Sequence, residues 1–150
     1  MIRITSRQHV LSTICPGCVF FYKTTNVGYI TEAPHYYIVV NRNPLADSTI
    51  YLCWISHEVE KIKKLRSPKF FSGTLIEISP VEYNILNTPS IIDCNRIEPR
   101  SIEEIINKHE RGMLQFKQNL TDGFIERIWD AIQLSPAVKD EIKDKLIPSN

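Results

Sequence analysis

The feature that most constrains the fold is a change in the spacing of apolar residues just after Pro99. Before this point, apolar residues occur in short runs rich in aromatic and β-branched side chains, which is typical of strands. After it, they recur at intervals of three and four, which is typical of amphipathic helices. Because no long helices separate the strand-like runs, the pattern argues against a parallel sheet. We therefore expect a mainly β fold with α: an antiparallel barrel over residues 1–100 and a helical extension over residues 101–150, packed together as one structural unit.

The strand-like runs set the expected elements of the first part of the chain. A short helix is expected to begin at Ser79, because Ser79, Pro80 and Glu82 form a capping-box pattern. A polar segment over residues 23–34 is expected to form a long loop. The expected strands cover residues 19–22, 35–40, 49–56, 73–78 and 90–94.

The second part begins with another capping-box pattern, formed by Ser101 and Glu104. It is expected to open a helix over residues 102–120, whose apolar residues fall on one helical face. Another helix is expected to begin at Thr121 or Asp122, and a last one to cover residues 137–146. These helices would cover one side of the barrel.

The net charge of the chain excludes few classes of function, because 18 Lys and Arg residues nearly balance 17 Asp and Glu residues. The balance is uneven along the chain: residues 1–100 carry 11 basic and 8 acidic side chains, and residues 101–150 carry 7 and 9. With only five glycines there is no glycine-rich phosphate-binding loop. No run of about 18 apolar residues predicts a membrane helix, and no signal-peptide pattern opens the chain, so a cytoplasmic location is expected.

Four cysteines raise the question of a metal or redox site. Cys15 and Cys18 are spaced like zinc ligands, but a second closely spaced pair is missing, since Cys53 and Cys94 stand alone. A redox pair normally opens a helix, whereas this one opens a strand. We expect reduced thiols that act as small core residues, and no metal or cofactor.

Four short segments, taken in order, resemble the PemK/MazF-type toxins. Residues 16–21 (PGCVFF) are similar to the Pro-Gly opening of that family, and residues 35–41 (HYYIVVN) to its second strand. Residues 52–56 (LCWIS) resemble the strand that ends in Ser or Thr, and residues 90–97 (SIIDCNRI) resemble a late segment that begins Ser-Val-Val and continues, after a few variable residues, to Asp-Gln. The resemblance covers about residues 16–97, plus the helical C-terminus.

This resemblance implies an SH3-like barrel and a toxin–antitoxin function. Active members of the family are dimeric, metal-independent endoribonucleases that cleave single-stranded RNA through the ribose 2′-hydroxyl. Such chemistry needs a base for the hydroxyl proton and a cation or acid for the phosphorane and leaving oxygen. The implied partners are single-stranded RNA, an antitoxin protein and a second copy of the chain.

Matching positions then indicate the candidate catalytic residues. His35 stands where the family usually has Arg, and its imidazole is suited to acid–base chemistry, although it lacks the phosphate fork of Arg. Ser56 matches the strand-end hydroxyl and is a candidate phosphate contact. Arg96 and Asn95 follow the last expected strand, and either Arg96 or Arg42 is a candidate charge stabiliser. Each also has a structural interpretation: a loop-bonded His, a turn Ser and an ion-paired Arg.

Other polar residues are candidates for RNA binding. His57 is next to Ser56, and Arg42 follows the second strand. Basic residues are most concentrated in one run that carries five charges in nine residues. Such a run can neutralise backbone phosphates, and it is also compatible with a solvated loop. Phe70 and Phe71 follow this run, and we expect them in the core rather than stacked on bases. The binding candidates are Arg42, His57, Lys61, Lys63, Lys64, Arg66, Lys69 and Asp93.

Two alternatives remain open. Departures from the family at His35 and Asp93 are compatible with a non-catalytic SH3-like module that binds RNA or an antitoxin-like peptide. The fold would also suit an accessory protein of a phage or mobile element that makes only protein contacts.

Overall fold

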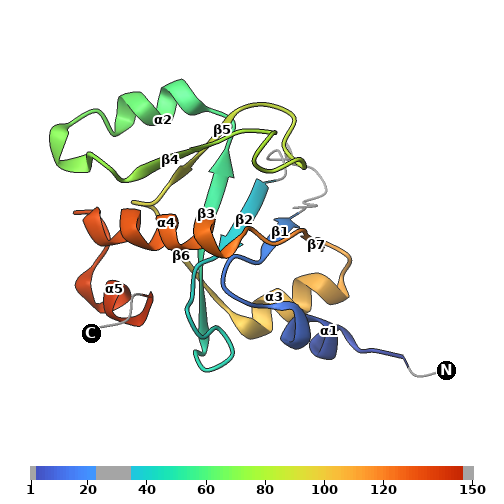
Figure 1. Cartoon of the computed structure of the whole chain (residues 1–150). Helices are drawn as coiled ribbons and strands as arrows, with labels where there is room; N and C mark the ends of the chain where they lie inside the picture. Colours follow the sequence, from blue (N-terminus) through green and yellow to red (C-terminus); the bar gives the residue numbers. More distant parts are fainter. Residues whose placement is uncertain (1–2, 23–34, 147–150) are drawn as a thin grey trace, which may run out of the picture.

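The computed structural model describes residues 3–22 and 35–146, and the loop expected over residues 23–34 lies outside them. Within these ranges, five α-helices, one 3₁₀ helix and seven strands form a β-rich α+β fold (Figure 1). The strands are β1 (Val19–Tyr22), β2 (His35–Val39), β3 (Thr49–Ser56), β4 (Leu75–Ile78), β5 (Ser90–Asp93), β6 (Glu98–Ser101) and β7 (Leu114–Lys117). The helices are α1 (Ser6–Thr13), α2 (Val59–Leu65), η1 (Lys69–Phe71), α3 (Ile102–Glu110), α4 (Asp122–Leu134) and α5 (Asp140–Leu146).

All described strand pairs are antiparallel, and they form one sheet in the order β4-β5-β3-β2-β1-β7. The long strand β3 pairs with β2 along one edge, and its other edge is shared by β6 and β5. Strands β4 and β7 end the sheet and do not pair with each other. The expected β-rich antiparallel fold is confirmed, but the described strands do not close into a barrel.

Helices cover both faces of this sheet, because side chains alternate between the faces along each strand. Val19, Ile38 and Cys53 point to one face, where they pack in a core with α4 and α5. Phe20 and Val39, their neighbours in sequence, point to the other face, where the second core is completed by α1 and α3. We call these the α4 face and the α3 face.

The five expected strands are all present, with differences of one or two residues at some ends. Ser79 and Glu82 form their reciprocal capping hydrogen bonds, at 3.1 and 3.2 Å, but they close a turn and no helix follows. Local capping chemistry was satisfied there without the length of helix that the pattern suggested.

The expected helix over residues 102–120 is wrong in its second half. Helix α3 ends at Glu110, and Gly112 adopts a positive φ of 70°, a conformation that suits glycine and redirects the chain. Strand β7 follows and pairs with β1, so part of the C-terminal region belongs to the sheet. The helix α4 was expected, and the short helix α5 begins three residues later than its expected start.

No helix in the described ranges has the length and apolar character needed to cross a bilayer.

Candidate nucleic-acid interface

A row of aromatic side chains crosses four adjacent strands on the α3 face. The strand register places Phe116 of β7 opposite Phe20 of β1, Phe20 opposite Tyr37 of β2, and Tyr37 opposite Trp54 of β3. The ring centroids of Phe20 and Tyr37 are 5.8 Å apart, and those of Phe20 and Phe116 are 6.2 Å apart. Cross-strand pairs of this kind stabilise the sheet and also build a continuous apolar floor.

His35 and Tyr22 extend this floor by one further row, at the start of β2 and the end of β1. The imidazole of His35 meets the indole of Trp54 edge to face, with ring centroids 4.6 Å apart. Tyr22 makes a similar edge contact with Tyr37, at 6.1 Å. Tyr22, His35, Tyr37 and Trp54 are each only partly buried, so these rings combine apolar packing with access from solvent.

Cationic side chains lie over two of these rings. The guanidinium carbon of Arg96 is 4.6 Å from the centroid of the Trp54 ring, and the ammonium of Lys108, from α3, is 4.6 Å from the centroid of Tyr22. Both distances are within the range of cation–π attraction. The Glu98 carboxylate joins Arg96 to Arg100, with N–O distances of 3.0 and 3.2 Å, and so holds two guanidinium groups at the same edge.

Some of these rings and cations line a pocket of about 340 Å³ between the sheet and α3. Its volume is within the range of sites that hold a small organic ligand. Trp54 and Arg96 form the rim of the pocket: Trp54 contacts the lining residue His35, and Arg96 lies over Trp54. Burial raises the pKa of Tyr37 above its ordinary value. The pocket is lined by Phe20, Tyr22, His35, Tyr37, Leu52, Pro99, Arg100, Glu104, Ile105, Lys108 and Leu114.

Of the expected catalytic residues, His35 and Arg96 are brought together, because both contact the ring of Trp54. Continuing the β2–β3 register by one residue places Ser56 opposite His35 at the same end of the sheet. However, Ser56 is only 5% exposed, and its Oγ accepts a hydrogen bond from the backbone N–H of Glu58 at 3.1 Å. Ser56 therefore caps the turn that leads into α2.

The exposed side chain of His57 lines a second, smaller pocket of about 210 Å³. This pocket also contains His35, Tyr36 and Ser90, so His35 stands between the two pockets.

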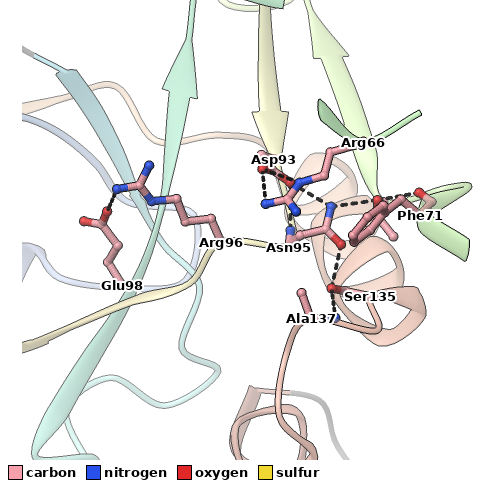
Figure 2. Close-up of polar contacts among 9 residues, drawn as sticks. Arg66, Phe71, Asp93, Asn95, Arg96, Glu98, Ser135 and Ala137 are labelled. Carbon is pink, nitrogen blue, oxygen red and sulfur yellow. Dashed lines mark hydrogen bonds and ion pairs between the residues drawn. The ribbon is translucent and has the colours of Figure 1, made fainter. Parts of the chain in front are cut away.

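Asn95 and Asp93 lie in a buried polar cluster, and neither residue lines the candidate pocket between the sheet and α3 (Figure 2). Asn95 Nδ2 donates to Asp93 Oδ1 at 2.7 Å and to Thr74 Oγ1 at 2.8 Å, while Asn95 Oδ1 accepts from the Ser135 hydroxyl at 2.6 Å. Since Ser135 ends α4, this cluster attaches the C-terminus of α4 to β5. Figure 2 shows Arg96 pointing away from Asn95, toward Glu98.

The basic run is divided between structural and exposed positions. Arg66 pairs with the buried Asp93 at 2.9 Å and its guanidinium carbon lies 4.9 Å from the centroid of Phe71, so it is part of the polar cluster. Lys61 and Lys63 form ion pairs with Glu58 and Glu77. Lys64 and Lys69 are exposed.

Two further expectations concern residues elsewhere on the surface. Arg42 lies over the ring of Trp129 on α4, with its guanidinium carbon 4.9 Å from the centroid, and so is far from the candidate pocket on the other face. The expectation that Phe70 packs in the core is wrong, because its side chain is 65% exposed. Phe71 is partly buried under Arg66.

The four cysteines are free thiols, and Cys18, Cys53 and Cys94 are buried in the two cores, as expected. Burial raises the pKa of Cys18 to about 12, so this thiol stays protonated. Among the described residues, no three His, Cys, Asp or Glu side chains gather in a way that would hold a metal ion.

Of the residues that line the candidate pocket, sequence reasoning named only His35 as a functional candidate. It missed the polar and half-buried aromatic residues of the pocket and its rim: Tyr22, Tyr37, Trp54, Arg100, Glu104 and Lys108. Two signals were available. Alternation along β2 and β3 puts His35, Tyr37 and Trp54 on one face once those strands are paired, and Glu104 and Lys108 have the i, i+4 spacing of one helix face. The sequence does not give the contact of α3 with this face of the sheet.

Comparison with known proteins adds no relative: no protein-family model matches the chain, and no curated protein matches it significantly.

Proposed function

We propose that the protein binds single-stranded RNA on the α3 face, in the pocket between the sheet and α3. The observation that carries this proposal is the group of half-buried rings of Tyr22, His35, Tyr37 and Trp54, with Arg96 placed over Trp54 and Lys108 over Tyr22. Unpaired bases stack on aromatic rings, and neighbouring cations neutralise the phosphates between them. A surface that offers both, in adjacent positions, suits a flexible single strand better than a duplex.

The basic run on α2 offers a competing surface, and a matched pair of double variants separates the two. Arg96→Ala with Lys108→Ala removes two cations from the rim, whereas Lys64→Ala with Lys69→Ala removes two exposed cations elsewhere. Binding of a labelled, unstructured RNA is measured by fluorescence anisotropy over a range of salt concentrations. We expect the first pair to lower the slope of log affinity against log salt by roughly 1.4, and the second to leave it unchanged.

Stacking is tested separately with Trp54→Ala, which should weaken RNA binding by about 1–3 kcal/mol. If the two double charge variants weaken RNA binding equally and Trp54→Ala has no effect on it, the RNA binds outside the pocket.

Metal-independent RNA cleavage through the 2′-hydroxyl is the second candidate function. It is favoured by one observation, that His35 and Arg96 flank the same indole, where a proton acceptor and a phosphate ligand would meet one nucleotide. RNA incubated with the protein in EDTA should be cut to products with cyclic phosphate ends, and His35→Ala should abolish the cut even at protein concentrations high enough to saturate the RNA. Intact RNA at high protein concentration would leave binding as the function.

We further propose that the chain is a PemK/MazF-like protein with a sheet related to the SH3-like barrel. Support comes from the order of the resembling segments and from the consecutive antiparallel pairing of β1, β2 and β3. On the basis of the same resemblance we propose that the protein forms a dimer and binds an antitoxin partner. Sedimentation of the purified protein tests the dimer.

A further inference from the structure

Glu104 is the only carboxylate among the described residues that line the pocket. Its position is fixed by the start of α3, where the Ser101 Oγ accepts a hydrogen bond from the Glu104 backbone N–H at 3.1 Å. The expected reciprocal bond of a capping box is not made, although Thr5 with Gln8 and Ser79 with Glu82 both make it.

Ser101 is also the last residue of β6, where it lies opposite Thr49 in the sheet. Within the described ranges, the Glu104 carboxylate forms no hydrogen bond or ion pair, and it is placed in the pocket wall next to the aromatic floor.

An ionised carboxylate only accepts hydrogen bonds, and this property distinguishes the four bases. On its Watson–Crick edge, guanine presents two adjacent donors, N1–H and the N2 amino group, which match the two carboxylate oxygens. Adenine and cytosine each place a ring-nitrogen acceptor beside their single amino group, and uracil places its N3–H between two carbonyl oxygens. A lone carboxylate beside a stacked base therefore favours guanine and disfavours the other three.

We propose that the pocket selects a guanine base of single-stranded RNA, with Glu104 as the residue that determines this specificity. The inference rests on the proposed RNA-binding function. The base stacks on the floor formed by Tyr37 and His35, its donor edge faces Glu104, and Lys108 lies one helical turn further along α3, where its ammonium neutralises a neighbouring phosphate.

The test compares three labelled probes by fluorescence anisotropy: a short oligouridine with one central guanosine, the same strand with adenosine, and the same strand with inosine, which lacks the N2 amino group. The wild-type protein should bind the guanosine strand about tenfold more tightly than the adenosine strand, with inosine between them. Glu104→Gln, which replaces one acceptor by a donor, should remove this preference: the guanosine strand should bind more weakly, and the adenosine strand should bind at least as tightly as it does to the wild type.

Glu103→Gln is the matched control, because Glu103 is the adjacent helix residue and its carboxylate is paired with Arg7 at 2.6 Å instead of lining the pocket. This variant should keep the guanosine preference. Equal binding of all three probes by the wild type, or a preference that survives Glu104→Gln, would overturn the specificity inference while the RNA-binding function stands. Failure of every probe to bind would instead refute the proposed function itself.

Discussion

Replacing Asn95 tests whether this residue belongs to the site or to the framework of the protein. Asn95 is 6% exposed and makes three side-chain hydrogen bonds, to Asp93, Thr74 and Ser135, which join β5, the segment before β4 and the end of α4. Asn95→Ala removes all three hydrogen bonds, and each of the three buried partner groups loses the bond that Asn95 supplied. We therefore expect a loss of stability and no direct effect on RNA binding.

The magnitude follows from the number of bonds. A buried hydrogen bond contributes about 0.5–1.5 kcal/mol net, so three bonds, one of them to a carboxylate, correspond to a loss of about 3 kcal/mol in the free energy of unfolding. With a urea m-value of about 2 kcal/mol/M for a small domain, the unfolding midpoint should fall by roughly 1.5 M. A loss of this size is a large part of the 5–15 kcal/mol typical of a whole domain, and so is easily measured.

The assay is urea unfolding followed by circular dichroism, with RNA affinity measured where each variant is folded. Arg96→Ala is the matched control. Arg96 follows Asn95 in the sequence but is exposed, and its ion pair with Glu98 should contribute at most about 1 kcal/mol to the free energy of unfolding. Asn95→Ala should lower stability and keep affinity, while Arg96→Ala should do the reverse. A stability loss below about 0.5 kcal/mol for Asn95→Ala, together with lost affinity, would refute the reasoning and return Asn95 to the site.

Three further perturbations test the framework. Burial and the stacked imidazole of His9 lower the pKa of His109, so the imidazole of His109 binds a proton more readily in the unfolded chain than in the folded one. The free energy of unfolding should therefore fall as pH drops below about 6.5. In urea titrations, His109→Asn should flatten this pH dependence. Gly73→Ala forces an L side chain to a φ of +80° and places its Cβ 2.9 Å from a leucine methyl of α4, which should cost about 1–3 kcal/mol; an unchanged melting temperature would contradict this. Arg66→Met leaves the buried Asp93 carboxylate without its cation and should cost about 3–5 kcal/mol by urea unfolding, whereas a loss below about 1 kcal/mol would show that this pair is solvated.

The elements that could be predicted are those whose signal is local. The short run of residues 49–56 has apolar side chains on both faces and is rich in β-branched and aromatic residues, which predicts a buried strand, and β3 has the expected bounds. By contrast, β6 has the sequence Glu-Pro-Arg-Ser, which carries no strand propensity and is a strand because it pairs with β3. The same is true of β7, whose pairing with β1 overrides the helical spacing of its apolar residues.

The site shows the same limit at the level of single residues. His35 and Ser56 do lie side by side, because β2 and β3 are adjacent and antiparallel, so the start of one strand lies beside the end of the other. Ser56 is nevertheless buried and caps a turn. Strand ends were a poor guide to Asn95, because β5 also runs antiparallel to β3, with Ile91 opposite Ser56. The residues that follow β5 are therefore carried away from the end of the sheet where His35 lies.

Arg96 reaches the site from the turn between β5 and β6, where Asn95 bonds to Ser135 at the end of α4 and Arg96 points away from it, toward Glu98 (Figure 2). The guanidinium of Arg96 also lies over the Trp54 ring. Placing a polar residue at a strand end thus predicts a site only when the order and direction of the strands are also known. In this chain, that order depends on the long-range pairing of β3 with β5 and β6, which no local pattern encodes.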